Sequence, residues 1–172
     1  MSKEIHIMVG IPASGKSTWI KEQCEKFKKI HNAFLVISRD QVRYNMLAAN
    51  DEYFSKEKEV FAEFTDLIKV AALSRAYQNI YIDATHLNAK SRAKLIRAIA
   101  GINYEGYDLV FECFQTPLVT CLKRNSQREG REKVPDSIIE KMFNDLTFPS
   151  DSECGIYQNI LHFDHYRIEV YK

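Results

Sequence analysis

One glycine-rich segment near the start of the chain constrains its fold more than any other feature. Residues 10–18 read Gly-Ile-Pro-Ala-Ser-Gly-Lys-Ser-Thr and match the pattern G-x-x-x-x-G-K-[ST] in full. The segment follows the apolar run 5–9 and precedes apolar residues at helical spacing, so it should join a strand to a helix. Glycines let the backbone curl and point successive N–H groups at phosphate oxygens, at the positive end of that helix. The segment therefore predicts a P-loop, which binds the triphosphate of a nucleotide.

This loop supplies most of the predicted nucleotide contacts. The loop residues expected to bind the nucleotide are Gly10, Pro12, Ala13, Ser14, Gly15, Lys16, Ser17 and Thr18. Lys16 would reach the outer phosphates and stabilise the charge that develops on them, and the Ser17 hydroxyl would hold Mg²⁺. A chance glycine-rich turn is the alternative, but the strand before the loop and the helix after it favour the P-loop.

Apolar runs alternate with helical patterns along the rest of the chain. Further strands are predicted at 34–37, 80–82 and 109–114, and a fifth at either 160–163 or 168–170. Helical spacing connects apolar residues within 20–30, 60–71 and 95–99. Asn88 and Gly101 are the expected N-cap and C-cap of the last of these helices. Strands that alternate with helices pair in parallel and are covered on both faces, so we expect one P-loop α/β domain spanning residues 1–172.

Composition and charge narrow the choice of compartment and partner. The 172 residues carry a net charge of +1, so no overall basic field would hold long nucleic acid, and any such contact should be local. Four widely spaced cysteines predict neither a zinc site nor a disulfide scaffold: Cys24, Cys113, Cys121 and Cys154. Since no signal peptide or long apolar span occurs, we expect a cytoplasmic protein without membrane contact.

Two acidic residues directly follow predicted strands, at the sheet edge where ligands bind in such folds. Asp40 comes after strand 34–37 and could accept the proton of a hydroxyl that attacks the γ-phosphate. Arg43, one helical turn further on, could orient Asp40 or hold a phosphate of the acceptor. Alternatively, Asp40 caps the helix and Arg43 is its surface partner. Asp83 follows strand 80–82 and could polarise a metal-bound water, position an arginine, or only cap a turn.

Residues 123–135 form a basic segment that Gly130 and Pro135 interrupt. Five basic residues stand there against two acidic ones. A kinase needs mobile positive charge that closes over the transferring phosphoryl group and excludes water. Arg124 and Arg128 are the candidates, because a guanidinium matches phosphate geometry better than an ammonium. A solvated helix end is the alternative, and the presence of the P-loop favours a helical lid.

Together these segments resemble the kinase domain of polynucleotide 5′-hydroxyl kinases. The similarity runs in order through 10–19, Arg39-Asp40 with Arg43, Asp83-Ala84-Thr85 with Leu87-Asn88, and 123–128 with Val134-Pro135. It covers most of the chain. The P-loop is shared by many families, whereas the R-D-x-x-R and K-R-N-S-x-R segments are more selective. The resemblance implies ATP as the phosphoryl donor, with Mg²⁺, and a 5′-hydroxyl end of DNA or RNA as the acceptor.

The resemblance also implies roles by position. Asp40 matches the general base and Arg43 the arginine on the acceptor's phosphate. Asp83 matches an acid that supports this arginine and the acceptor site, where it would bind substrate. Arg128 matches a catalytic lid arginine on the donor phosphates, with Arg124 beside it. Three further substrate contacts would be Arg39, Thr85 and Asn88. A place for this chain within a larger nucleic-acid repair enzyme is a further possibility that the family implies.

Other functions stay open on the sequence alone. Residues 148–155 also resemble small P-loop kinases that phosphorylate seryl-tRNA or small molecules. A nucleotide-dependent switch without transferase activity is another candidate, although a switch needs no acceptor-site base such as Asp40. The D-x-D-x-T/V motif of a phosphatase domain does not occur. The run His162-Phe163-Asp164-His165 is similar to a metal cluster on a strand but lacks a third source of ligands.

Overall fold

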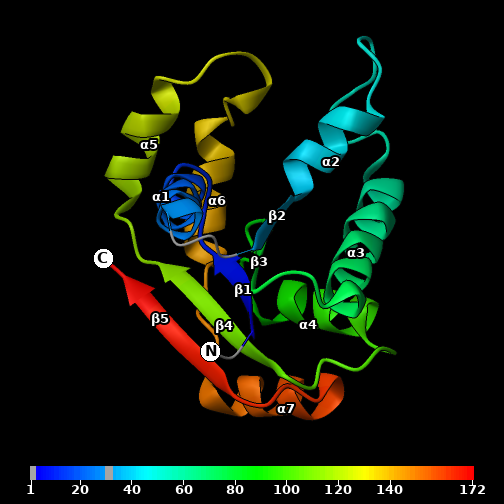
Figure 1. The fold of residues 1–172 in the computed structure, drawn as a ribbon. Coiled ribbons are helices and arrows are strands. Elements are labelled where there is room, and N and C mark those ends of the chain that lie inside the picture. Colours follow the sequence, from blue (N-terminus) through cyan, green and yellow to red (C-terminus); the bar gives the residue numbers. More distant parts are fainter. Residues whose placement is uncertain (1–2, 30–32) are drawn as a thin grey trace.

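A parallel β-sheet forms the centre of the structure, a computed structural model that describes residues 3–29 and 33–172 (Figure 1). Its strands are β1 (Lys3–Val9), β2 (Phe34–Ser38), β3 (Asn79–Asp83), β4 (Tyr107–Phe114) and β5 (Tyr166–Tyr171). They lie in the order β2-β3-β1-β4-β5, and each neighbouring pair is parallel. The predicted parallel sheet and its first four strands are therefore confirmed.

The fifth strand corresponds to the second of the two predicted segments. β5 contains 168–170, whereas 160–163 is not a strand, because the helix α7 (Asp151–Leu161) ends there. Ser150 caps α7 through its side chain, and Cys154, Tyr157 and Leu161 form a buried face at helical spacing. A short apolar run can belong to either kind of element, and here the helical spacing decides.

The run at 162–165 consequently lies in a loop and not on a strand. His162 adopts a left-handed conformation at the C-cap of α7, and Asp164 accepts a hydrogen bond from the backbone N–H of Gly106 at 3.0 Å. Within residues 3–29 and 33–172, no group of three or more His, Cys, Asp or Glu side chains is arranged to hold a metal ion.

Helices cover both faces of the sheet (Figure 1). Besides α7 they are α1 (Lys16–Lys29), α2 (Arg39–Met46), α3 (Glu57–Ser74), α4 (Ala89–Ile99), α5 (Leu118–Ser126) and α6 (Asp136–Asp145), with a 3-10 turn at Gly130–Glu132. α1 packs on one face of the sheet, while α3, α4 and α7 pack on the other. Of the apolar positions predicted for the first helix, Ile30 lies outside the described residues. No helix in the described part of the chain is long and apolar enough to span a membrane.

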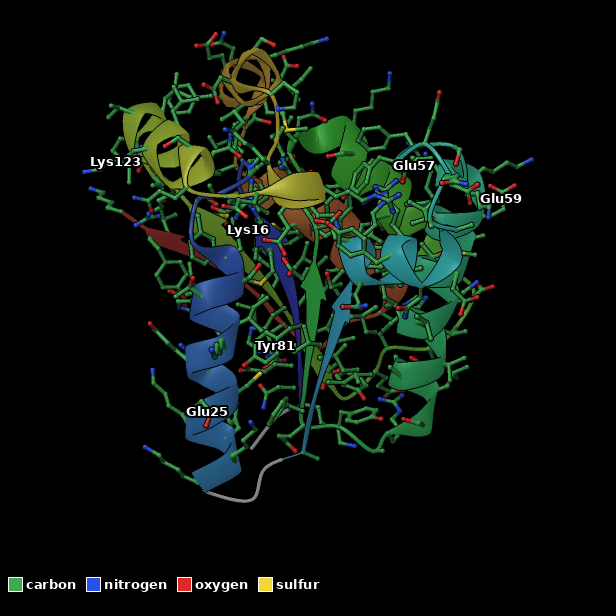
Figure 2. The ribbon with its side chains drawn as sticks, turned by 90° about the horizontal axis from the view of Figure 1, so that it is seen from above. Lys16, Glu25, Glu57, Glu59, Tyr81 and Lys123 are labelled. Carbon is green, nitrogen blue, oxygen red and sulfur yellow. The ribbon has the colours of Figure 1, made fainter. Side chains whose placement is uncertain are left out.

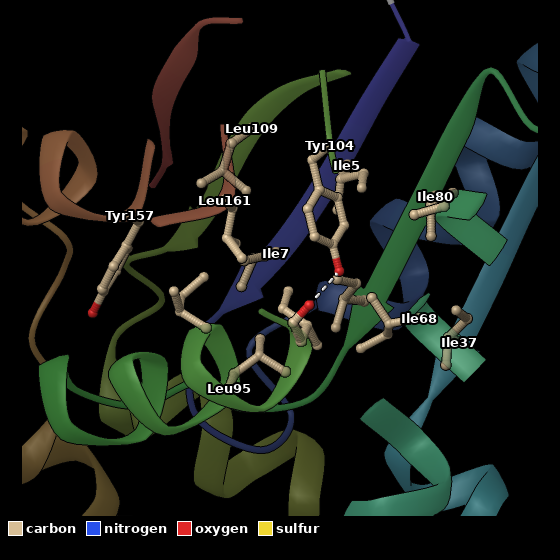
Figure 3. Close-up of a cluster of buried hydrophobic side chains, with 14 of the residues drawn as sticks. Ile5, Ile7, Ile37, Ile68, Ile80, Leu95, Tyr104, Leu109, Tyr157 and Leu161 are labelled. Atoms are coloured by element: carbon tan, nitrogen blue, oxygen red, sulfur yellow. Dashed lines mark hydrogen bonds between the residues drawn. The ribbon is translucent and has the colours of Figure 1, made fainter. Parts of the chain in front are cut away.

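The larger core lies between the sheet and α3, α4 and α7 (Figure 3). Ile5 and Ile7 of β1 point into it because alternate residues of a strand face the same side. Tyr104 is fully buried there, and its hydroxyl donates a hydrogen bond to the carbonyl of Ile99 at 2.9 Å. Burial of each such side chain contributes about 1.5–3 kcal/mol, so this core holds the sheet and its covering helices in a fixed arrangement.

The N-cap predicted for α4 is confirmed, whereas the C-cap is Ala100 and not Gly101. Asn88 accepts a hydrogen bond from the backbone N–H of Ser91, and the Ser91 hydroxyl in turn accepts one from the backbone of Asn88. The helix ends at Ile99, and Gly101 follows the C-cap residue Ala100 with a φ of 94°. A residue with a side chain adopts that conformation only with strain, so a glycine fits here.

The strand order brings the polar segments predicted from the sequence to one edge of the sheet. β1 lies between β3 and β4, so the P-loop that follows it is central. Ser38 at the end of β2 pairs in register with Asp83 at the end of β3. Asp40, two residues beyond Ser38, therefore lies in the first turn of α2 at the same edge as the P-loop.

Candidate active site

The loop between β1 and α1 has the backbone geometry of a phosphate cradle. Gly15 has a φ of 104°, and Ala13 also lies in the left-handed region with a φ of 61°. A Cβ on Gly10 would lie 2.8 Å from the Ser14 Oγ and 3.1 Å from the Phe114 Cβ. Glycine is therefore required at residue 10 by close packing and at residue 15 by conformation.

Lys16 is folded into this loop. Its ammonium donates hydrogen bonds to the carbonyls of Gly10 at 2.9 Å and Ile11 at 2.8 Å, and to the Ser14 Oγ at 3.4 Å. Burial lowers the pKa of Lys16 to about 8. The ammonium is thus held at the cradle by oxygens that phosphate oxygens can replace.

Ser17 and Asp83 lie side by side at the ends of the loop and of β3. The Ser17 hydroxyl donates a hydrogen bond to the Asp83 Oδ2 at 3.2 Å. Burial raises the pKa of Asp83, against the opposing effects of Lys16 and Ser17. A hydroxyl and a carboxylate beside a phosphate site are the oxygen ligands that Mg²⁺ takes together with substrate phosphates, so these residues fit the ion. Asp83 is therefore better placed to support a metal than to cap a turn.

Asp40 is held by only one of its two oxygens. Its Oδ1 accepts hydrogen bonds from Arg43 and, at 3.0 Å, from the Tyr53 hydroxyl. No hydrogen bond to Oδ2 is found in the described residues, and the side chain is 66% exposed. The alternative role as a helix cap is wrong, because Ser38 caps α2 by accepting a hydrogen bond from the backbone N–H of Gln41. Asp40 is thus an oriented carboxylate with one oxygen facing solvent.

Arg43 is buried, not a surface partner of Asp40. Glu57 accepts two hydrogen bonds from it, at 3.0 and 2.9 Å, and one from Arg39 at 2.6 Å. The implied support of Arg43 by Asp83 is not seen, because Asp83 faces Ser17 while Glu57 holds the arginine. Within the described residues, the Nε atoms of Arg39 and Arg43 are buried without a hydrogen-bond partner.

The basic segment 123–135 begins in α5 and ends at Pro135, the N-cap of α6. Arg124 donates a hydrogen bond to the carbonyl of Ala13 in the P-loop at 3.3 Å. Arg128 donates one to the carbonyl of Glu132 at 3.4 Å. Asn125 is fully buried and bonds the carbonyl of Val134 at 2.6 Å and its N–H at 3.1 Å, so it ties the two ends of the segment together.

The structure gathers these charges around Lys16. Asp83, Arg128 and Asp40 all act electrostatically on the Lys16 ammonium, the two acids raising its pKa and the arginine lowering it. Figure 2 shows Lys16 between α5, which carries Lys123, and the start of α3, which carries Glu57. Charged residues predicted from three separate segments therefore lie within electrostatic range of Lys16.

Three residues predicted to contact the substrate make structural contacts within the protein. The side chain of Asn88 caps α4, and the carbonyl of Thr85 accepts a hydrogen bond from the N–H of Gly10 at 3.0 Å. Arg39 packs over the Phe61 ring, 5.2 Å from its centre, while it bonds Glu57. Their contact with substrate stays a prediction.

The comparisons with known proteins agree with this fold. A family model described as an AAA domain matches residues 5–149. The chain belongs to this family. Its parallel sheet and its structural neighbours show the P-loop kinase fold. One structure similar to it is that of a fungal RNA kinase, with a TM-score of 0.64 and 13% identity, covering 100% of this chain and 78% of that one.

Two further proteins similar to this AAA domain are longer than it. The L-seryl-tRNA(Sec) kinase of Methanococcus maripaludis is 25% identical over 144 residues, covering 83% of this chain and 52% of the relative. A chain in the structure of a Pnkp1/Rnl/Hen1 complex matches with a TM-score of 0.57 and 22% identity, covering 78% of this chain and 44% of that one. This AAA domain thus spans about half the length of the curated relative it matches.

Two residues of the site were missed by the reasoning from sequence. Glu57 and Tyr53 contact Asp40 or Arg43 across a loop of this AAA domain. Neither follows a strand, so the rule that ligands bind at strand ends gave no sign of them. The signal that was available is the aromatic pair Tyr53-Phe54, which two residues separate from an acidic helix start.

Proposed function

We propose that this chain transfers the γ-phosphoryl group of ATP to the 5′-hydroxyl end of a polynucleotide, DNA or RNA. The observation that carries the proposal is the carboxylate of Asp40, which Arg43 and Tyr53 hold by one oxygen at the same sheet edge as Lys16. A nucleotide switch has no need for an oriented, exposed base opposite its phosphate site. The resemblance in the R-D-x-x-R and K-R-N-S-x-R segments supports a polynucleotide as the acceptor.

On the donor side, the loop would receive the phosphates of ATP. Its inward N–H groups and the N-terminus of α1 attract the β- and γ-phosphates, and Lys16 exchanges its carbonyl partners for phosphate oxygens. Mg²⁺, for which Ser17 and Asp83 provide oxygens, would neutralise charge on the phosphates.

On the acceptor side, Asp40 would take the proton of the 5′-hydroxyl through its free oxygen. The hydroxyl oxygen then forms a bond to the γ-phosphorus, the bond between that phosphorus and the bridging oxygen of ADP breaks, and ADP leaves. Arg43 keeps Asp40 in place and, as the resemblance implies, would contact a phosphate of the acceptor.

The basic segment would complete the site. Arg124 already contacts the P-loop, and the charge of Arg128 reaches Lys16, so closure of the segment would bring both guanidinium groups to the transferring phosphoryl group. The likeness to a chain of the Pnkp1/Rnl/Hen1 complex also supports a role for this domain inside a larger assembly.

A second acceptor has an observation in its favour. The similarity to the seryl-tRNA(Sec) kinase covers 83% of this chain, and a serine hydroxyl needs the same kind of base. An acceptor screen with radiolabelled ATP separates the candidates: 5′-hydroxyl DNA and RNA oligonucleotides, seryl-tRNA and small alcohols. Label on the oligonucleotides supports our proposal, and label on seryl-tRNA or small alcohols alone contradicts it. A nucleotide switch would leave every acceptor unlabelled.

Replacement of the proposed base tests the mechanism. We expect Asp40→Asn to lower kcat by 10²–10⁴-fold, the usual contribution of a general base, with ATP affinity nearly unchanged. Asp66→Asn is a matched control, because Asp66 is 64% exposed and pairs with Lys69 three residues on, as Asp40 does with Arg43. Full activity in Asp40→Asn would exclude Asp40 as the base.

A further inference from the structure

An exposed aromatic ring lies beside the proposed acceptor site. Phe54, in the segment between α2 and α3, is 68% exposed, the second most exposed of the large apolar side chains in the described residues. It packs at right angles against Tyr53, with 4.8 Å between ring centres and 84° between planes. An aromatic ring with this exposure contributes little hydrophobic free energy to folding, so core packing does not account for a phenylalanine at this position.

The ring is connected to the proposed base through two contacts. Arg43 lies over both rings, 4.7 Å from the centre of Tyr53 and 5.4 Å from that of Phe54. Arg43 and the Tyr53 hydroxyl both bond the Asp40 Oδ1. Proton acceptor, phosphate-binding cation and exposed aromatic ring thus follow one another in direct contact.

The same segment is held to the basic lid. Arg131 donates hydrogen bonds to the carbonyls of Ala49 at 3.1 Å and Asp51 at 3.4 Å. A ligand that reached Asp40 would therefore be bordered by Phe54 and by the lid. A polynucleotide end fits these neighbours, because it has a hydroxyl, a phosphate and a flat base within one nucleotide.

We propose that Phe54 is a stacking platform for the base of the nucleotide that carries the 5′-hydroxyl; this inference rests on the proposed function. Stacking on an aromatic ring is available to every base, so the platform would hold the terminal nucleotide without selecting its sequence. Arg43 would hold the phosphate of that nucleotide, and Phe54 would fix the base so that its hydroxyl faces Asp40. The alternative is that Phe54 only covers Arg43. In that case, the effect of replacing Phe54 would not depend on the base of the acceptor.

The test compares two acceptors that differ only in that base. One is a single-stranded 5′-hydroxyl oligonucleotide, and the other is the same strand with an abasic first nucleotide. For the unmodified protein we expect about a tenfold higher KM with the abasic strand, within the usual range for one stacking contact. Phe54→Leu should raise the KM of the intact strand about tenfold and leave that of the abasic strand within twofold. Phe54→Trp should restore discrimination.

Controls separate stacking from other effects. Val70→Ala, an exposed apolar change 13 residues along α3 from Glu57 and thus about 20 Å away, should change neither KM. The KM for ATP should be the same in every variant. Anisotropy of a 3′-labelled strand, with a non-hydrolysable ATP analogue present, measures the same discrimination without catalysis.

The outcomes are distinct. Equal losses on both strands in Phe54→Leu, or an unmodified protein indifferent to the base, would overturn the platform while phosphorylation of the strand upholds the proposed function. If no strand is phosphorylated and no strand binds, both the platform and the proposed function are overturned. Base-dependent binding that needs an aromatic residue 54, without transfer, would support the platform and refute the reaction.

Discussion

At the scale of single residues, Glu57 organises the acceptor side of the site. It accepts hydrogen bonds from Arg39 and Arg43, and Arg43 in turn holds Asp40. Removal of this carboxylate would leave the guanidinium groups of Arg39 and Arg43 without the anion that they share, and that of Arg43 is buried. Glu57 is therefore a positioning residue for the proposed base, not a group that touches the reacting atoms.

We expect Glu57→Gln to raise the KM for a 5′-hydroxyl oligonucleotide about tenfold while the KM for ATP stays within twofold. A hydrogen bond to a charged group contributes about 1.5–3 kcal/mol, and 1.4 kcal/mol corresponds to a factor of ten. Steady-state kinetics with either substrate varied measures the split. Glu59→Gln, an exposed change on the same helix, is the control. Equal effects on both KM values would contradict this role.

Lys16 makes nucleotide binding sensitive to alkaline pH. Because burial lowers its pKa to about 8, Lys16 loses its charge in the free protein as the pH rises through that value. Phosphates would stabilise the ammonium, so binding of Mg-ATP near pH 8 should take up a proton and weaken as the pH rises further. Calorimetry in two buffers of different ionisation heat measures the uptake. Binding of Mg-ATP to a Lys16→Met protein should no longer take up this proton. Proton uptake that persists in Lys16→Met would assign the proton to another group.

At the scale of elements, a buried amide closes the basic segment 123–135, the predicted lid. Asn125 bonds both backbone groups of Val134 and, at 3.1 Å, the Asp136 carboxylate at the start of α6. These bonds close the basic segment into a loop and join α5 to α6. The segment's composition indicated a lid, but the amide that closes it was not identified from sequence, because its partners are nine and eleven residues away.

We expect Asn125→Ala to loosen this loop. Unsatisfied partners of a buried group cost about 1–3 kcal/mol, so the segment should open far more often and expose its lysines and arginines. Trypsin should then cleave within 124–133 at least tenfold faster, and the KM for ATP should rise. Asn144→Ala, on the neighbouring helix α6 and exposed, should leave cleavage unchanged. Unaltered cleavage in Asn125→Ala would show that other contacts hold the lid.

At the scale of the whole molecule, the surroundings of two buried histidines shift their pKa values in opposite directions. Burial opposes charge on His6, but hydrogen bonds to Glu112 at 2.7 Å and to Glu4 outweigh it and raise its pKa to about 9. Burial lowers the pKa of His86 to about 4. His6 lies in the central strand β1, between β3 and β4.

The contributions of His6 and His86 to the free energy of unfolding should therefore both be largest near pH 6.5. The stabilisation by His6 is complete below its ordinary pKa of 6.5 and is lost as the pH rises towards 9. That by His86 is present above 6.5 and is lost as the pH falls towards 4. Each limb should amount to on the order of 3 kcal/mol, from about 1.4 kcal/mol per pKa unit.

Urea denaturation across this pH range measures both limbs. His6→Gln should flatten the alkaline limb alone. His86→Asn should flatten the acidic limb alone, and asparagine tolerates the φ of 40° at residue 86. A variant that flattened the opposite limb would contradict the assignment.

The sequence by itself determined the P-loop, the parallel sheet and the edge where the site lies. These follow from local rules: the spacing of Gly10 and Lys16 is set by the shape of one loop, and alternation of strands with helices requires parallel pairing. Only the tertiary structure decided that β5 and not 160–163 completes the sheet, that Asp83 faces Ser17, and that Glu57 holds Arg43. Such contacts depend on which side chains meet after the helices pack on the sheet, and no spacing along the chain records them.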